Sequence, residues 1–580
     1  MRLAAPGLLV LALATPVTAD ALLPLATQSV TGAFLAGQQA MSELRTPDAA
    51  KYFGDAVNGQ WDNGLVIGHA FVAYAADGQI SAAVDAAKHL LDVDPKDEMA
   101  HVVLATDALK QRRYDAVITA VDGLSTESFE GITASILKAW ALTGQGKVDD
   151  AFASLDKLAS GGLEEFLVFH RALMADVAGR SDLAVKYITQ AHDADPLTPD
   201  VVEAYARILG NAGQFDAAID AIVQFASQGL SSPTIDIVQK ALAAHQRPGR
   251  FTQTVQEGAA EMFHSVGVAL ARENSNDVAM VLMRLGQYLA PGNDNIAMIV
   301  GQLYDGAGQA KLANAIYDAI PSGSPLRAQA TVRVADNLDT LGDRPEAIRR
   351  LANIVAVNPT NIDAISVLGD LYRTDKKYDL AVGAYSKALD ITGGQSPGDW
   401  RFYYVRGIAQ ERNNQFPSAE ADFLKALALN PGQPQVLNYL GYSWVDKGMN
   451  LTRALDMIQK AVAASPNDGY IIDSLGWAYY RLGRYDDAVT QLEQAALLRP
   501  NDPEINDHLG DAYWRVGRKL EAHFQWNVAF SLDTDGSVKK RVGPKITGGL
   551  DAAPKDGESA PVLEAPPADG ASLEPVAATN

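Results

Sequence analysis

Apolar positions recur along most of this chain with a period close to 34 residues. The clearest unit runs from Asp468 to Pro500, where two amphipathic runs flank the turn Gly483-Arg484-Tyr485. Apolar residues at three- and four-residue spacing predict helices, so each unit is a pair of helices. Repeats of this kind bury their apolar faces on their neighbours, which predicts an all-α solenoid of helical hairpins rather than one globular core.

Small residues mark the same two positions in each unit. Alanines that open the second helices are separated by 34, 38, 35, 34 and 34 residues: Ala347, Ala381, Ala419, Ala454, Ala488 and Ala522. Glycines occupy the middle of the first helices: Gly369, Gly407, Gly441, Gly476 and Gly510. Glycine inside a helix costs about 1 kcal/mol against alanine, so we expect each glycine to face the alanine at a close helix crossing.

The period and these small residues resemble the tetratricopeptide repeat. The resemblance implies a right-handed superhelix whose first helices line a concave groove. The rhythm weakens between residues 229 and 258 and is lost after about Asp533. We therefore predict an N-terminal superhelix over residues 20–245 and a C-terminal superhelix over 246–532. Residues 533–580 are predicted to be a disordered, acidic tail rich in proline and alanine.

The N-terminus is typical of a secretory signal peptide over residues 1–19. Arg2 precedes a short apolar run, and small residues favour cleavage after Ala19 or Ala21. An ordinary first helix is the alternative. The chain has no cysteine, which excludes disulfides and a lipidated anchor. These features predict an exported, periplasmic protein without a transmembrane anchor.

The charge balance argues against nucleic-acid binding. The net charge is −22, from 48 basic and 70 acidic residues, and such a chain is repelled by phosphate backbones. One basic cluster stands out near the C-terminus: Lys539, Lys540, Arg541 and Lys545. It is either a solvated end or a contact for an acidic partner or the membrane surface.

No constellation of catalytic or cofactor-binding residues is recognisable. The nine histidines include no pair at metal-ligand spacing, and no nucleophile elbow, phosphate loop or dinucleotide fingerprint occurs. We therefore predict a non-enzymatic protein with no cofactor and no metal. An enzyme whose site lacks a known motif is the alternative.

The candidate functional site is the predicted groove. Positions 2, 5, 9, 12 and 13 of the first helices point into it in this repeat type, which selects Arg401, Tyr404, Asn438, Tyr442, Tyr470, Asp473, Trp477, Tyr480, Arg481, Asp507, Asp511, Trp514 and Arg515. Trp, Tyr and Arg dominate binding hot spots, and the carboxylates suit a segment with some positive charge. The alternative is that the aromatic residues pack between repeats.

Three runs resemble a narrower group of proteobacterial tetratricopeptide proteins: residues 438–444, 468–477 and 506–517, within Trp400 to Phe530. The resemblance implies a periplasmic scaffold that holds a carboxy-terminal processing protease and cell-wall hydrolases. A module of envelope assembly or secretion machinery without a protease is the alternative. Chaperone-binding members grip a terminal carboxylate with Lys and Asn, and Tyr404, Asn438, Asp473 and Asp507 do not form such a basic clamp.

Overall fold

The computed structural model describes residues 29–158, 163–534 and 536–550. Every regular element within them is a helix, which confirms the predicted all-α class. None of the described helices is both long and apolar enough to cross a bilayer. The predicted signal peptide, residues 1–19, and the last part of the predicted tail, residues 551–580, lie outside the described residues.

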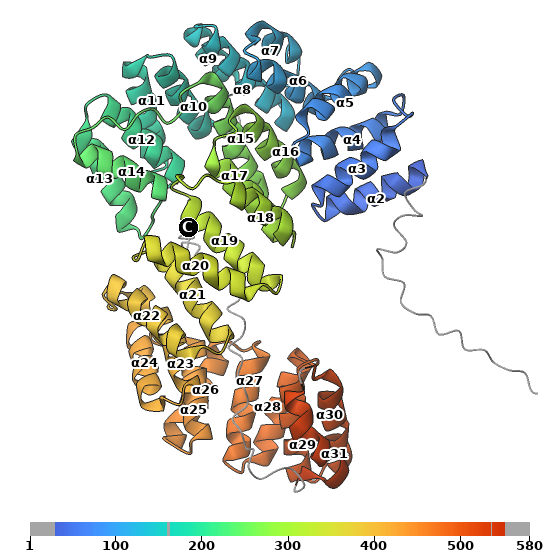
Figure 1. Ribbon diagram of the computed structural model, residues 1–580, viewed down its shortest axis with the longest axis vertical. Helices are drawn as coiled ribbons and strands as arrows, with labels where there is room; N and C mark the ends of the chain where they lie inside the picture. Colours follow the sequence, from blue (N-terminus) through green and yellow to red (C-terminus); the bar gives the residue numbers. More distant parts are fainter. Residues whose placement is uncertain (1–28, 159–162, 535, 551–580) are drawn as a thin grey trace, which may run out of the picture. The chain divides into compact units, whose positions relative to one another are not determined.

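The chain forms two compact units, residues 1–343 (unit 1) and 344–580 (unit 2), which are described separately (Figure 1). Unit 1 contains α2 Val30–Ser42, α3 Thr46–Val57, α4 Gly64–Asp77, α5 Ile80–Val93, α6 Glu98–Lys110, α7 Tyr114–Ala120, α8 Phe129–Gly144, α9 Val148–Leu155, η1 Asp156–Leu158, α10 Glu164–Val177, α11 Ser181–Ala194, α12 Pro199–Asn211, α13 Phe215–Ser227, α14 Pro233–Ala243, α15 Val255–Arg272, α16 Asn276–Leu289, α17 Asp294–Gly306, α18 Ala310–Ala319 and α19 Arg327–Thr340. Unit 2 contains α20 Arg344–Val357, α21 Ile362–Thr374, α22 Tyr378–Thr392, η2 Pro397–Asp399, α23 Trp400–Arg412, α24 Phe416–Leu429, α25 Pro434–Asp446, α26 Leu451–Ala464, α27 Gly469–Arg481, α28 Tyr485–Leu498, α29 Pro503–Arg515, α30 Lys519–Leu532 and α31 Ser537–Gly548.

The helices pair as hairpins, and the clearest sequence unit shows why. The Asp468 side chain accepts hydrogen bonds from the backbone N–H groups of Tyr470 and Ile471 and so caps the start of α27. Gly483 turns the chain with φ +75°, a left-handed conformation that glycine adopts without strain, and α28 then packs back on α27. The predicted helical-hairpin repeat is confirmed.

The helix crossings are close, but the glycines face large side chains rather than the predicted alanines. A Cβ atom on Gly476 would lie 2.6 Å from Leu492 Cγ, and one on Gly510 would lie 2.5 Å from Trp526 Cδ1. These partners stand four residues after Ala488 and Ala522, which are themselves fully buried. Each glycine therefore makes room for the bulky core residue one helical turn beyond the alanine.

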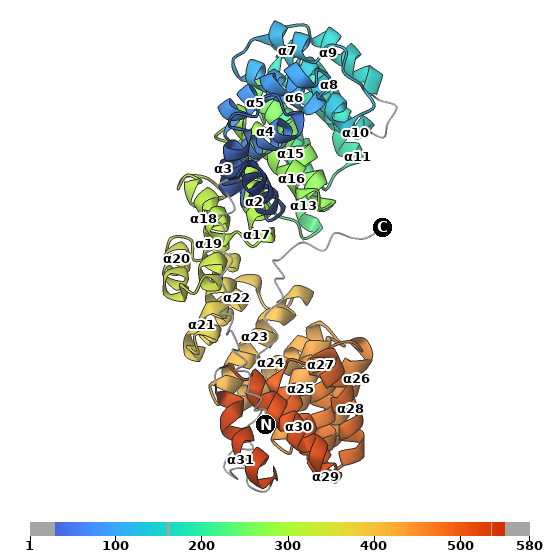
Figure 2. The ribbon, with the colours of Figure 1, turned by 90° about the vertical axis from the view of Figure 1, so that its right-hand side faces the viewer.

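Helices α15 and α16 of unit 1 break the simple solenoid. They lie on the inner side of the arc made by the preceding helices, where α15 packs against α8 and α10 and α16 packs against α4 and α6 (Figures 1 and 2). Gln256 Nε2 donates to the Leu109 carbonyl at 2.8 Å, and Tyr288 donates to Asp107 at 2.9 Å. The inner face of these repeats is thus filled by the chain itself.

This hairpin explains why the compact units divide after Asp343 rather than near the predicted boundary at 245/246. The stretch after α14 does leave the repeat rhythm, as the sequence indicates. However, α15 and α16 return to the N-terminal repeats instead of starting a separate body. Contacts between residues this far apart in sequence are not contained in the repeat period.

Helix α31 occupies the first part of the segment that the sequence assigned to a disordered tail. Val538, Val542 and Lys545 lie on one buried side of it, and α31 packs against α29 and α30. The Asp533 carboxylate accepts from the Gly536 and Lys539 backbone N–H groups and so holds the chain entering the helix. In the sequence these residues stand out as a basic run, although Val538, Val542 and Lys545 also have helical spacing.

Candidate protein-binding surface

The predicted binding residues come from the first helices of successive repeats in unit 2. We call the predicted positions of α23, α25, α27 and α29 the inner surface. Contacts from these positions to the neighbouring first helix join the helices: Asn438 Nδ2 donates to Ser474 Oγ at 3.2 Å, and His508 Nδ1 lies 2.9 Å from Asp473 Oδ1. The inner surface is therefore continuous from α25 to α29.

An aromatic stack forms the centre of this surface. The Trp477 ring stacks on Tyr480 with centroids 4.7 Å apart and on His508 with centroids 4.1 Å apart. Trp477 is 8% exposed and Tyr480 is 9% exposed. Burial, followed by the charge of Asp511, raises the pKa of Tyr480 to about 12, so its hydroxyl keeps its proton at neutral pH. The stack thus belongs partly to the contact between repeats, as the alternative interpretation proposed.

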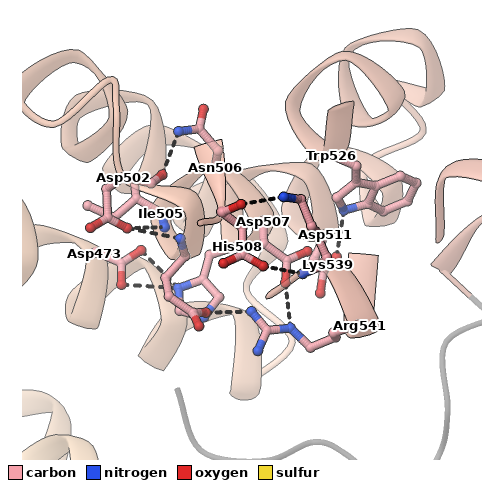
Figure 3. Close-up of polar contacts among 12 residues, drawn as sticks. Asp473, Asp502, Ile505, Asn506, Asp507, His508, Asp511, Trp526, Lys539 and Arg541 are labelled. Carbon is pink, nitrogen blue, oxygen red and sulfur yellow. Dashed lines mark hydrogen bonds and ion pairs between the residues drawn. The ribbon is translucent and has the colours of Figure 1, made fainter. Parts of the chain in front are cut away.

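The acidic residues of the inner surface already have partners within the chain. Arg541 Nε lies 2.6 Å from Asp507 (Figure 3). Lys545 Nζ lies 2.7 Å from both Asp507 and Asp511. Arg541 also contacts Glu504. The basic cluster of the sequence is thereby explained in part: two of its members hold α31 on α29. These carboxylates do not by themselves select a positively charged partner.

The pKa values of the two aspartates that share Lys545 are shifted in opposite directions. Burial opposes ionisation of Asp507, but Lys545 and Arg541 outweigh it and lower the pKa of Asp507 below its ordinary value. Burial, followed by the charge of Asp507, raises the pKa of Asp511 to about 6. The Asp511 carboxylate also accepts from Trp526 Nε1 at 2.9 Å. One ammonium thus holds two neighbouring carboxylates, and the ionised form of Asp507 is favoured.

Three polar atoms on the inner surface are buried and have no hydrogen-bond partner among the described residues: Asn438 Oδ1, Tyr442 OH and Trp477 Nε1. The side chains are 7%, 4% and 8% exposed, respectively. Two other indoles of unit 2 are satisfied, since Trp444 donates to Glu420 and Trp526 donates to Asp511. A buried polar atom without a partner costs about 1–3 kcal/mol, so these three atoms suit a ligand that supplies the missing bonds.

The remaining predicted residues lie at the margins. Tyr404 packs against Phe423 and Tyr439, and Arg481 pairs with Asp446 at 3.1 Å. The others are more accessible: Arg401 and Arg515 are exposed, and Tyr470 and Trp514 are half-buried. Arg515 donates to the Tyr480 hydroxyl at 3.2 Å. His508, Arg541 and Lys545 were not among the predicted residues. The sequence did contain a hint of their contacts, because the acidic residues of the first helices and the basic run after α30 have opposite charges.

Comparisons with known proteins agree with the repeat period. Residues 334–399 and 404–469 match the family model described as "Tetratricopeptide repeat", and residues 476–517 match the model described as "TPR repeat". These ranges contain most of the helices that form the inner surface.

Related sequences share only part of the chain. A TPR repeat-containing protein of Pseudomonas aeruginosa is 29% identical over 160 residues, which cover 27% of this chain and 26% of that protein. The cytochrome c-type biogenesis protein CycH of Rhizobium meliloti is 30% identical over 151 residues, which cover 26% of this chain and 38% of that protein. The chain thus spans well under half the length of these curated relatives.

The crystal structure of the APC/C hetero-tetramer Cut9–Hcn1 aligns with 91% of this chain and 99% of its own, with a TM-score of 0.39 and 14% identity. The repeat period, the helical hairpins and the matched family models lead to one conclusion. Residues 334–399, 404–469 and 476–517 are tetratricopeptide repeats, and they carry most of the candidate binding surface.

Proposed function

We propose that this chain is a non-catalytic scaffold that binds an extended segment of a partner protein on the inner surface of unit 2. The observation that carries the proposal is the trio of unpartnered buried atoms, Asn438 Oδ1, Tyr442 OH and Trp477 Nε1. Tetratricopeptide repeats present such surfaces to proteins, and this surface contains both hydrogen-bond donors and an acceptor.

An extended segment fits this trio better than a helix does. The backbone N–H and C=O groups of a helix are already bonded to each other, whereas those of an extended segment are free. Asn438 Oδ1 accepts a backbone N–H, and the Trp477 indole donates to a backbone carbonyl. The Tyr442 hydroxyl can do either. The stacked rings of Trp477 and Tyr480 supply an apolar contact beside these atoms.

We further propose that the scaffold acts in the periplasm and presents substrates, such as cell-wall hydrolases, to a carboxy-terminal processing protease. Two features support this assignment. Residues 1–19 have the pattern of a secretory signal peptide. The runs at residues 438–444, 468–477 and 506–517 resemble a group of proteobacterial proteins with such an adaptor among them.

The test compares two tyrosines of the same helix, α25. Tyr442→Phe removes an unpartnered hydroxyl, so we expect an unchanged or higher melting temperature and about ten-fold weaker partner binding. Tyr439→Phe is the matched control, because the Tyr439 hydroxyl donates to Glu411 at 3.2 Å. The control is expected to lose stability and keep its partner.

The measurement is affinity capture from an envelope extract on the immobilised chain, followed by quantitative mass spectrometry and by melting of each variant. A processing protease that is captured by the parent chain and by Tyr439→Phe, but depleted with Tyr442→Phe, supports both proposals. Equal capture by Tyr442→Phe and the parent would remove the inner surface from the binding site. Reproducible absence of any processing protease would overturn the protease assignment alone.

A second candidate function is a module of envelope assembly machinery. The observation that favours it is the similarity to CycH, whose name places that protein in cytochrome c-type biogenesis. In that case the same capture experiment recovers assembly factors in place of a protease, with the same dependence on Tyr442.

A further inference from the structure

A cluster of three potential metal ligands lies in unit 1, away from the candidate binding surface. His264 and Glu261 stand one turn apart on α15, and Asp200 lies near the start of α12. His264 is 5% exposed and Glu261 is 3% exposed. One ligand atom from each residue lies within 4.8 Å of the other two.

The distances within this cluster are long for hydrogen bonds. His264 Nδ1 lies 3.4 Å from Asp200 Oδ2 and 3.3 Å from Glu261 Oε1. Charge-assisted N–H···O bonds are about 2.7–2.9 Å long, and one Nδ1–H cannot point at two carboxylates at once. His508 in unit 2 shows the ordinary arrangement, since its Nδ1 lies 2.9 and 3.0 Å from the two oxygens of a single carboxylate, Asp473.

The same distances match the edge of a tetrahedral metal site. Zinc binds imidazole nitrogen and carboxylate oxygen at about 2.0–2.2 Å, and two ligands of a tetrahedron at that radius are about 3.4 Å apart. Octahedral ligands at a similar radius would be about 3 Å apart. The two measured nitrogen–oxygen distances thus favour a four-coordinate ion over an octahedral one.

Charge balance points to a divalent cation as well. The nearby Glu203 is paired with Arg207 at 2.8 Å, and Arg207 also donates to the Pro248 carbonyl at 2.7 Å. Asp200 and Glu261 then place two carboxyl groups beside one histidine. Buried charges need compensation, and a divalent ion with a neutral imidazole would balance the two carboxylates.

The cluster is open to solvent on one side, and one of its carboxylates is held by a hydrogen bond. The Asp200 side chain keeps 24% exposure, so an ion can enter from solvent and hold a water molecule as its fourth ligand. Ser265 Oγ donates to Glu261 Oε1 at 3.2 Å, a contact that orients a metal-binding carboxylate. Sequence inspection missed the site because Asp200 stands about 60 residues from the other two ligands.

We propose that Asp200, Glu261 and His264 form a binding site for a zinc-like divalent transition-metal ion that fastens α15 to α12. Occupancy would stabilise unit 1, because the ion binds ligands from both helices only in the folded chain. The role assigned to the site is structural, because its ligands come from two different helices.

The test titrates Zn²⁺ into the full chain after chelator treatment and removal of the chelator, using calorimetry and thermal melting. We expect one ion per chain and a higher melting temperature for unit 1. His264→Gln and Asp200→Asn should each bind Zn²⁺ at least ten-fold more weakly. His508→Gln is the matched control and should bind like the parent, because His508 faces only one carboxylate.

Failure of the parent chain to bind Zn²⁺ would overturn the proposal, as would binding by both ligand variants equal to that of the parent. Circular dichroism checks that each variant is folded. Asp200→Asn is the milder change, because Asp200 is partly exposed, and it decides the outcome if His264→Gln does not fold. Mg²⁺, which prefers six oxygen ligands, should bind far more weakly than Zn²⁺; equal binding would assign the site to non-selective cation attraction.

Discussion

Unit 1 and unit 2 use the same repeat but treat their inner faces differently. In unit 1 the α15–α16 hairpin fills the inner face, where two of the unit's unpartnered polar side chains, Trp140 beside α15 and His170, have no exposure at all. In unit 2 the unpartnered atoms of Tyr442 and Trp477 belong to side chains that keep a small exposure. The difference shows that a repeat pattern predicts an inner face but does not predict whether that face is open to a partner. This difference supports the proposal that partners bind to unit 2.

The largest expected effect comes from removing the ion pairs that hold α31 on α29 in unit 2. Lys545→Met leaves the buried Asp511 without a cation, whereas Asp507 keeps Arg541, and an uncompensated buried charge costs about 3–5 kcal/mol. We expect α31 to detach and its backbone amides to lose protection in hydrogen exchange. Lys540→Met is the control on the same helix, since Lys540 is exposed. Equal protection of α31 in both variants would contradict the assigned role of Lys545.

The next effect comes from disturbing the packing of α15 on the inner face of unit 1. A Cβ atom on Gly258 of α15 would lie 2.0 Å from the Trp140 ring, so Gly258→Ala should destabilise unit 1 by about 3 kcal/mol. Gly68 of α4 has no neighbouring atom within 4 Å, so Gly68→Ala should stabilise the unit by about 0.5–1 kcal/mol. Urea unfolding measures both, and effects of the same sign would refute the close packing of the hairpin.

The smallest effect depends on pH. Burial lowers the pKa of His170 to about 3, so the folded chain keeps this ring neutral while the unfolded chain protonates it below about pH 6.5. The contribution of neutral His170 to the free energy of unfolding is complete above pH 6.5. It is lost as the pH falls towards 3, and the loss reaches about 2 kcal/mol at pH 5. Urea unfolding of unit 1 at pH 7, 6 and 5 should show a shallower pH dependence for His170→Leu. Parallel curves would disprove this assignment.

The sequence was sufficient for the elements and insufficient for their long-range contacts. The 34-residue period predicts the hairpins, because each repeat depends only on its own residues and its neighbours. It also predicts that Asp473, Trp477 and Asp507 share one surface; Asp473 and Trp477 both contact His508, the residue after Asp507 on α29. It cannot predict that α16 lies on α4, or that Asp200 meets His264, because no local pattern encodes either contact.

The α15–α16 hairpin also has a consequence for how unit 1 folds. A simple solenoid can grow repeat by repeat, since every contact is made between neighbours. Here Arg284 bonds to the Ala76 carbonyl and Tyr304 to Thr46, partners separated by 208 and 258 residues. Such long loops must close before these contacts form, which slows folding and makes it more cooperative. The inner face of the early repeats of unit 1 therefore stays exposed until most of the unit has been synthesised.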